Sequence, residues 1–276
     1  IINEEIKKRY GDESVKVVLC GGFPCFVAGT LIRTIDGMKN IEDLKIGDSV
    51  LTHDGEYGTV NAVMQKSDAP TWIVKSHGIP KPLETTAEHP FYIRRKKFPK
   101  ARKYENRWGT PEWVAVSEIR PGDKVGYRVR EGNLEYENED FWFLVGRYLA
   151  DGHVSNGYVH IDANEQKLPA LKALVERIGF HHTVNNGRTC IRLSIRNSAF
   201  LDFVEGFGKY AYGKKLSGMC FELKSNLKMA LFNGWAEGDG YDDGQGGRRV
   251  TTVSKELAFG MAQIARDSFK TAVSMN

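Results

Sequence analysis

A cysteine, a threonine and a histidine in the first third of the chain have the residue types that an acyl transfer within a peptide chain requires. Cys25 opens the run CFVAGTL, and Thr86 and His89 form a T-x-x-H motif. A thiol that attacks the carbonyl preceding it needs a proton on the departing amide nitrogen, and a histidine can supply that proton. A threonine hydroxyl beside them can hold the peptide or the imidazole in line. Taken singly, a buried cysteine is more often a packing residue, and one T-x-x-H motif arises by chance.

Residues 25–31, combined with the T-x-x-H motif, resemble the start of an intein, whose first residue is a nucleophilic Cys or Ser. The resemblance implies that Cys25, Thr86 and His89 are catalytic residues of protein splicing. It also implies that splicing starts with an N-to-S acyl shift at Cys25, a step for which no cofactor is expected.

A repeated decapeptide supports the same resemblance. Residues 41–50 (IEDLKIGDSV) recur 75 positions later as residues 116–125 (VSEIRPGDKV). Self-similarity of this kind usually means two copies of one supersecondary unit. The duplication resembles the pseudo-twofold, all-β Hint fold of inteins and hedgehog-type processing domains.

Two apolar runs further along the chain each end in an acid and a glycine. They are LVGRYLADG (residues 144–152) and FNGWAEGDG (residues 232–240), and their acids are Asp151 and Asp239. One apolar helix that ends in Asp-Gly is common, whereas two copies that lead into the same order of strand and helix are not. Both runs resemble the LAGLIDADG motif of homing endonucleases.

The LAGLIDADG resemblance implies a nuclease site between two paired helices. Gly146 and Gly234 would let these helices approach closely, since glycine has no Cβ. Asp151 and Asp239 would then lie together as catalytic residues and metal ligands, because carboxylate oxygens suit Mg²⁺. The ion activates water and neutralises the charge that develops on the phosphate. The expected cofactor is therefore Mg²⁺ and the expected substrate is double-stranded DNA, while the motifs single out no catalytic lysine.

The segment in front of Cys25 carries a third motif. Residues 17–25 (VVLCGGFPC) resemble the catalytic loop of DNA (cytosine-5) methyltransferases, in which a strand runs into GGFPC and the cysteine attacks a flipped base. An ordinary strand that enters a Gly-Pro turn is the simpler explanation. The resemblance implies that residues 1–24 are a fragment of a methyltransferase host, the N-extein. Pro24 abuts the carbonyl under attack, and its ring restricts the backbone, so the acyl shift is expected to be slow.

Basic residues are concentrated in residues 94–107 (RRKKFPKARKYENR), which hold eight Lys or Arg and one Glu in a chain of net charge +4. This concentration favours a polyanion such as DNA as partner, although a solvated loop without a partner explains it equally well. A segment rich in Lys and Arg but poor in Asn and Gln is suited to phosphates, and base contacts are expected from later strand pairs. The predicted phosphate contacts are Arg94, Arg95, Lys96, Lys97, Lys100, Arg102 and Lys103, and the predicted base contacts are Arg188, Arg192 and Arg196.

The pattern of apolar residues predicts a multidomain chain. Short strands separated by turn pairs such as Asp-Gly extend to about residue 130, and helical periods alternate with strand pairs from Asp140. The polar, acidic residues 131–140 mark the predicted boundary. We therefore expect an all-β Hint domain over residues 25–130 and an α+β LAGLIDADG domain of αββαββα repeats over residues 131–276, with its second repeat incomplete.

The predicted elements of the second region begin the same order twice. The predicted helices cover residues 141–152, 167–178, 197–205, 231–240 and 255–268, and the predicted strands cover residues 157–161, 181–184, 188–195 and 248–253, with a turn at residues 185–187. In the first region, strands are predicted at residues 15–19, 30–34 and 58–63.

The composition is ordinary for a folded protein. Of 276 residues, 41% are hydrophobic and 27% are charged. No run approaches the roughly 18 apolar residues of a membrane helix. The four cysteines form no C-x-x-C pair, so we expect reduced thiols in the cytoplasm and no structural zinc. A monomer is also expected. The absence of an initial Met predicts a fragment of a longer chain, and the incomplete second repeat, with Met275 rather than His before Asn276, predicts truncation at the C-terminus.

The residues and resemblances predict protein splicing combined with site-specific cleavage of double-stranded DNA. The expected partners are the flanking exteins and the uninterrupted host gene. The alternative is a fragment of a cytosine-5 methyltransferase that carries a degenerate intein able only to bind DNA. A hedgehog-type processing domain would share Cys25 and the T-x-x-H motif but would carry no LAGLIDADG pair.

Overall fold

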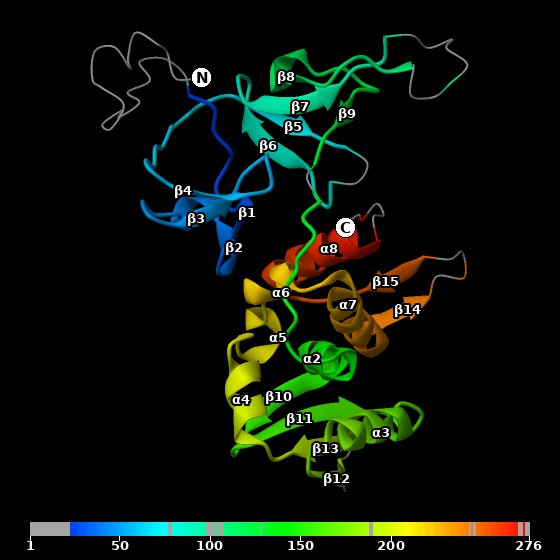
Figure 1. Cartoon of the computed structure of the whole chain (residues 1–276). Helices are drawn as coiled ribbons and strands as arrows, with labels where there is room; N and C mark the ends of the chain where they lie inside the picture. The colour runs from blue at the N-terminus through cyan, green and yellow to red at the C-terminus, as the bar shows by residue number, and fades with distance from the viewer. Residues whose placement is uncertain are drawn as a thin grey trace.

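The computed structural model describes residues 23–76, 79–97, 103, 107–127, 129–187, 190–242, 244, 247–269 and 273. The predicted strand at residues 15–19, the methyltransferase-like motif up to residue 22, and Lys100, Arg102 and Arg188 lie outside this set. The chain forms two parts, one above the other: a β-rich N-terminal part (residues 23–130) and a mixed C-terminal part (residues 131–273) (Figure 1). No helix among the described residues is both long and apolar enough to cross a membrane.

The described residues of the N-terminal part form three small antiparallel sheets. The first has the order β2-β1-β3-β4, the second pairs β5 with β6, and the third has the order β8-β7-β9. A few apolar residues form its core, among them Phe91, Ile93 and Val114. The strands are β1 (Leu31–Thr34), β2 (Gly37–Asn40), β3 (Ser49–Leu51), β4 (Tyr57–Thr59), β5 (Thr71–Val74), β6 (Leu83–Thr86), β7 (Pro90–Arg94), β8 (Glu112–Ala115) and β9 (Lys124–Val125). The strand predicted at residues 58–63 therefore ends earlier, at Thr59.

The decapeptide duplication is visible as a repeated local fold. The 3-10 helices η1 (Ile41–Asp43) and η3 (Val116–Glu118) begin 75 positions apart, and each leads into a short strand, β3 or β9. Gly47 and Gly122 both have positive φ, +96° and +93°, a backbone region that glycine tolerates best. In both copies the following aspartate accepts a hydrogen bond from the backbone N–H three residues before it. The sequence repeat therefore encodes one turn structure used twice.

The C-terminal part begins with a helix on a four-stranded sheet of order β10-β11-β13-β12. Alternate residues of β11, such as Val159 and Ile161, are buried, which is the period that one covered sheet face requires. Asn138 and Asn197 cap the first turns of two helices by accepting from backbone N–H groups. The elements are α2 (Glu139–Asp151), β10 (Gly152–Ser155), β11 (Tyr158–Ala163), α3 (Leu168–Ile178), β12 (His182–Asn186), β13 (Ile191–Ile195) and α4 (Ser198–Glu205).

The turn predicted at residues 185–187 is misplaced. Asn185 and Asn186 pair with Arg192 and Ile191, so both asparagines belong to β12 and the connection covers residues 187–190. Cross-strand pairing here prevails over the local turn preference of the Asn-Gly pair.

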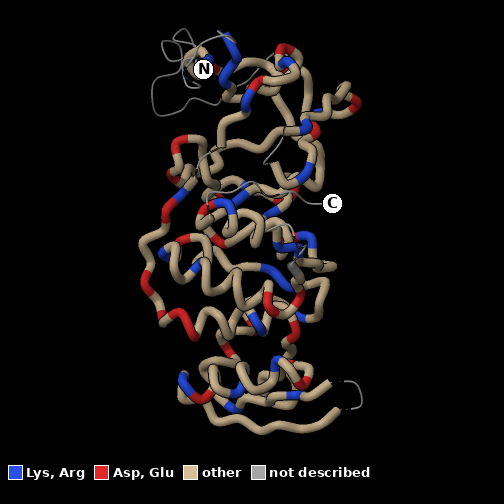
Figure 2. The backbone as a smooth tube through the Cα atoms, turned by 90° about the vertical axis from the view of Figure 1, so that its right-hand side faces the viewer, with Lys and Arg blue, Asp and Glu red and all other residues tan. Residues whose placement is uncertain are grey.

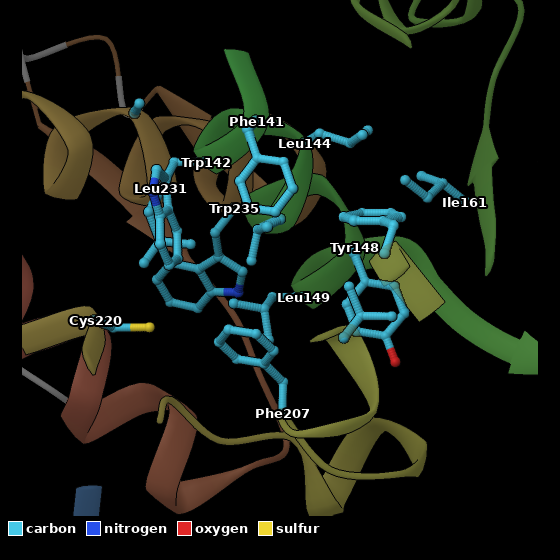
Figure 3. Packing of buried hydrophobic residues seen from close by; sticks show 14 of the residues in the cluster. Phe141, Trp142, Leu144, Tyr148, Leu149, Ile161, Phe207, Cys220, Leu231 and Trp235 are labelled. Carbon is cyan, nitrogen blue, oxygen red and sulfur yellow. The ribbon is translucent and has the colours of Figure 1, made fainter. Parts of the chain in front are cut away.

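The remainder of the C-terminal part starts the order of helix, strands and helix again. Its elements are α5 (Tyr210–Gly213), α6 (Met219–Glu222), α7 (Ser225–Asp239), β14 (Gly240–Asp242), β15 (Arg248–Val250) and α8 (Lys255–Phe269). Helix α7 begins six residues before the start of the predicted helix at residue 231. Strand β15 begins at the predicted residue 248 but ends three residues before the predicted end at residue 253. Helices α2 and α7 lie side by side, and Figure 3 shows Trp142, Leu144, Leu149, Leu231 and Trp235 in the apolar core around them.

Candidate functional site

Cys25 and Thr86 are joined by two hydrogen bonds. The Cys25 amide nitrogen donates to Thr86 Oγ1 at 3.0 Å, and the Thr86 amide nitrogen donates to the Cys25 carbonyl at 3.0 Å. Phe26 and Thr85 form an antiparallel bridge next to them, so the start of the Hint-like sequence lies along β6. The hydroxyl of Thr86 thus holds the nitrogen of the Pro24–Cys25 peptide bond, the atom that an acyl shift would release.

His89 lies beside this pair, in the turn between β6 and β7. Its ring packs against Phe26 at a centroid distance of 4.0 Å and against Phe91 at 5.6 Å. Burial lowers the pKa of His89, against a weaker opposite effect of Glu88. The Nδ1 atom is buried and has no hydrogen-bond partner among the described atoms. A neutral imidazole with an available ring nitrogen is therefore held next to the residue that follows Cys25.

An ion pair that the sequence does not indicate lies close to both groups. Lys66 Nζ contacts Glu88 Oε1 at 2.8 Å. Burial raises the pKa of the Cys25 thiol, while Lys66 lowers it and Glu88 raises it, and the net direction is upward. The thiol is therefore protonated in the resting protein. Lys66 belongs to no sequence motif and lies in a connection without regular secondary structure, so the sequence gives no sign of its contact with Glu88.

The two glycines of the LAGLIDADG-like motifs lie at the contact between α2 and α7. A Cβ on Gly146 would lie 2.2 Å from the Leu231 carbonyl oxygen, and one on Gly234 would lie 2.0 Å from the Phe143 carbonyl oxygen. Carbon and oxygen atoms do not approach so closely, so only glycine fits at either position. The close approach of the helices that the sequence predicts is therefore present.

Asp151 and Asp239 end these helices and lie near each other. Burial raises the pKa of Asp239, and the charge of Asp151 raises it further. Asp151 Oδ2 forms an ion pair with Arg147 Nη2 at 3.0 Å. The Arg147 side chain is only 1% exposed. Its three nitrogens have no partner in hydrogen-bond geometry among the described atoms, so its contact with Asp151 is an ion pair without a hydrogen bond.

The pair of acids suits a divalent cation that also binds water and phosphate. Mg²⁺ is typically held by one or two carboxylates and completes its shell with water and substrate oxygens. Asp239 is a desolvated carboxylate facing a second negative charge, and a cation would relieve both penalties. Within the described part of the chain, no group of three or more His, Cys, Asp or Glu side chains could hold a metal ion by itself. An ion at Asp151 and Asp239 would therefore need water or substrate oxygens as its remaining ligands.

Two lysines that the motifs did not reveal complete the helix ends. Lys214 Nζ donates to the Tyr148, Leu149 and Ala150 carbonyls at 2.9, 3.0 and 3.3 Å, and Lys167 Nζ donates to the Glu237 and Gly238 carbonyls. Burial lowers the pKa of Lys214 to about 8, against the opposing charges of Asp239 and Asp151. Each helix thus has a cation at its negative C-terminal end. Both lysines come from distant segments, so no local pattern signals them.

The basic segment contains side chains in two different situations. Arg94 Nε donates to the Gly109 carbonyl, and Arg95 binds the Asp123 carboxylate at 3.2 Å. These two arginines therefore already have partners in the N-terminal part. Lys96, Lys97 and Lys103 are exposed, which leaves them open to solvent and to phosphate.

Two of the three predicted base contacts, Arg192 and Arg196, lie on the polar face of the four-stranded sheet, and Arg188 lies outside the described residues. Arg192 forms a bidentate ion pair with Asp162 at 2.8 and 3.1 Å, and Arg196 lies over the Tyr158 ring at 5.9 Å. On the same face, His153 is half-buried against His160, with ring centroids 4.9 Å apart.

Comparison with protein families finds a match within the N-terminal part. Residues 24–87 match the Hint domain. This range contains Cys25 and Thr86 and ends two residues before His89.

Among curated proteins, the chain is 28% identical over 274 residues to an iron–sulfur cluster assembly SufBD family protein of Mycobacterium bovis, covering 87% of this chain and 32% of that protein. It is 26% identical to an uncharacterized protein of Methanocaldococcus jannaschii, covering 80% and 35%. It is 23% identical to the ATP-dependent DNA helicase Hel308 of Thermococcus kodakarensis, covering 92% and 28%. The chain thus spans about a third of the length of the curated relatives that it matches.

Two solved structures have weak similarity to the chain. Full-length DUF199/WhiA of Thermatoga maritima aligns with a TM-score of 0.35 and 11% identity over 50% of this chain and 47% of that one. I-DmoI in complex with DNA and Mn aligns with a TM-score of 0.34 and 13% identity over 47% of this chain and 77% of that one. Both scores are below the level at which a shared fold is established.

Proposed function

We propose that the chain is part of an intein: residues 25–130 are the Hint domain that starts protein splicing, and residues 131–276 are an inserted LAGLIDADG homing endonuclease. The observation that carries the splicing assignment is the hydrogen bond from the Cys25 amide nitrogen to Thr86 Oγ1 within a segment that matches the Hint domain. Asp151 and Asp239 at the ends of two helices in glycine-mediated contact support the nuclease assignment.

The first step would exchange one acyl bond for another. Cys25 Sγ attacks the Pro24 carbonyl carbon, a C–S bond forms, and the C–N bond to the Cys25 nitrogen breaks. The thiol loses its proton, and the departing nitrogen gains one. The neutral His89 imidazole would take up the thiol proton and then, as an imidazolium of low pKa, would donate a proton to the departing nitrogen. Thr86 holds the nitrogen still during the exchange.

The nuclease step would depend on the two helix-end carboxylates. When bound there, Mg²⁺ supplies charge neutralisation at the scissile phosphate and activates water. Asp151 and Asp239 would hold the ion. Arg147 and Lys214 add positive charge near both carboxylates. The exposed Lys96, Lys97 and Lys103 would contact phosphates of the double-stranded DNA.

The names of the relatives support an inserted element. A SufBD family protein and a DNA helicase have unrelated activities by name, yet each matches more than four fifths of this chain over about a third of its own length. Sequence shared by unrelated hosts over such a block is what an intein produces. The comparisons do not support residues 1–24 as a methyltransferase segment, so that assignment stays a prediction, as do the cytoplasmic location and the monomeric state.

The alternative, a methyltransferase fragment whose degenerate intein only binds DNA, is not favoured. Degeneration would remove selection on the splicing residues and on the acids. Cys25 and Thr86 instead keep both of their mutual hydrogen bonds, and Asp151 lies close enough to Asp239 for its charge to raise the pKa of Asp239.

The splicing assignment is tested by thiol-induced cleavage at the Pro24–Cys25 bond in the complete reading frame. Cys25→Ala should abolish cleavage, because that thiol alone adjoins the carbonyl. Cys190→Ala is the matched control and should cleave like the wild type. Equal cleavage in Cys25→Ala would refute the assignment.

The nuclease assignment is tested by cutting of the uninterrupted host gene with Mg²⁺. Asp151→Asn should abolish cutting but retain DNA binding, since it removes a metal-ligating charge at nearly constant volume. Asp140→Asn, at the opposite end of the same helix, is the control. Cutting by Asp151→Asn at the wild-type rate would show that the acids are structural.

A further inference from the structure

A cluster of charged side chains joins the N-terminal and C-terminal parts. Glu222, at the end of α6, accepts from Arg33 Nη2, Tyr57 Oη and Arg130 Nε, each at 3.1 Å. Arg33 also contacts Asp267 Oδ2 of α8 at 3.3 Å. Figure 2 shows acidic and basic residues close together in the middle of the molecule, where the two parts meet.

Arg33 and Asp267 form the buried end of this cluster, whereas Glu222 and Arg130 are 24% and 22% exposed. The side chains of Arg33 and Asp267 are 6% and 0% exposed. A buried charge without a partner is costly, and a pair separated by more than 230 residues has to be assembled by the tertiary structure. Burial alone would raise the pKa of Glu222, but its hydrogen bonds from Arg130 and Tyr57 prevail and lower it. The two parts are therefore held in one arrangement.

Backbone contacts fix the same arrangement. The Gly218 amide nitrogen donates to the Asp36 carbonyl at 3.0 Å, and Gly37 and Ser217 form an antiparallel bridge. A Cβ on Gly218 would lie 1.6 Å from the Ile35 carbonyl oxygen. The β1–β2 hairpin of the N-terminal part thus lies directly on the backbone of the C-terminal part.

The C-terminal part also reaches the segment that follows Cys25. Lys255 Nζ, at the start of α8, donates to the Gly29 carbonyl. The Gly29 amide nitrogen donates to both carboxylate oxygens of Glu42, at 2.9 and 2.7 Å, and Gly29 has a φ of +78°. On the other side, the Val27 amide nitrogen donates to the Glu84 carbonyl. The few residues between Cys25 and β1 are thus held from both sides.

We propose that the C-terminal part is a component of the acyl-shift site: Lys255 and Glu222 are positioning residues that fix the backbone carrying the Cys25 thiol. Lys255 holds Gly29, and Glu222 holds Arg33 at the next strand. The inference rests on the proposed role of Cys25. It implies that the C-terminal part is needed to position the Cys25 thiol, although Asp151 and Asp239 take no part in splicing.

The test measures the backbone and the thiol in the full chain. Amide hydrogen exchange is followed over residues 27–33, and alkylation of Cys25 by iodoacetamide is followed by peptide mass spectrometry. Lys255→Met should speed exchange of these amides by roughly two- to tenfold, the effect of losing one hydrogen bond of ordinary net strength. Cys25 alkylation should speed up with it. Glu222→Gln should act in the same direction through Arg33.

Two further variants separate positioning from general destabilisation. Lys255→Arg keeps a donor for the Gly29 carbonyl and should restore both rates to those of the wild type. Lys215→Met removes an exposed lysine of the same part and should change neither rate. Circular dichroism confirms that each variant is folded.

The proposal is overturned if folded Lys255→Met and Glu222→Gln both keep wild-type exchange and alkylation, or if Lys215→Met changes both rates equally. These readouts need no splicing chemistry. A failure of the Cys25→Ala cleavage test would therefore refute the proposed function, whereas unchanged exchange would refute only the positioning role.

Discussion

Replacing Gly234 with alanine should separate the two central helices and destabilise the C-terminal part. The new Cβ would lie 2.0 Å from the Phe143 carbonyl oxygen and 2.9 Å from the Phe143 carbonyl carbon. Ordinary carbon–oxygen contacts in proteins are about 3.3 Å. The obstacle is backbone within a helix, so no side chain can turn away, and α2 and α7 have to move apart by about 1 Å.

The magnitude follows from opposing contributions. Alanine is the better helix former by about 1 kcal/mol. Overpacking a core costs about 1–3 kcal/mol, and backbone on both sides places this site at the upper end. A gap of about 1 Å along the contact also forfeits up to half of the dispersion energy of the atom pairs that lose contact. The expected net loss in unfolding free energy is about 2–3 kcal/mol.

Urea unfolding monitored by far-UV circular dichroism measures this loss. Gly213→Ala is the matched control, because a Cβ there meets no atom within 4 Å, and it should change stability by less than about 0.5 kcal/mol. If Gly234→Ala is no less stable than Gly213→Ala, the close helix contact, and with it the basis for bringing the two acids together, is wrong.

Three further experiments test His89, the pair Lys96 and Lys97, and Lys214. His89→Ala should slow thiol-induced cleavage at the Pro24–Cys25 bond by about 10²- to 10⁴-fold, and an unchanged rate would make His89 a packing residue. Neutralising Lys96 and Lys97 to Gln should flatten the slope of log affinity for DNA against log salt by roughly 1.8, and an unchanged slope would place these lysines away from phosphates. Burial lowers the pKa of Lys214 from 10.5 to about 8, so the folded chain loses this proton at a lower pH than the unfolded chain does. The unfolding free energy should therefore rise between pH 8 and pH 10.5. The rise relative to Lys214→Met should reach at most about 3 kcal/mol, and parallel stability curves for the two proteins would contradict the pKa shift.

The features that the sequence predicted well are those encoded by local spacing. The offset of 75 between the two decapeptides reappears as two 3-10 helices with the same glycine conformation. Most of the helices and strands predicted after Asp151 are present, because local apolar periods indicate them, whereas β10, α5, α6 and β14 were not predicted. Gly146 and Gly234 were correctly expected at a close helix contact, since few other roles require glycine inside an apolar helix.

The features that the sequence missed depend on long side chains and tertiary contacts. Lys214 reaches the end of α2 from about 65 residues away, and Lys66 reaches Glu88 from a connection without a motif. The turn assigned to Asn185 and Asn186 was wrong because pairing with β13 outweighs a local preference. A lysine side chain leaves no periodic signal, so only the folded chain shows which lysines matter.

The two proposed activities are separate in chemistry but joined in structure. Asp151 pairs with Arg147 of its own helix, so Asp151→Asn should leave Cys25 reactivity intact. Glu222 instead binds Arg33 and Tyr57 of the other part, so its loss acts on the nucleophile without touching the acids. We expect Glu222→Gln to change the rate of Cys25 alkylation and Asp151→Asn to leave it unchanged. That result would show that the C-terminal part supports the Cys25 site and supplies no catalytic group to it.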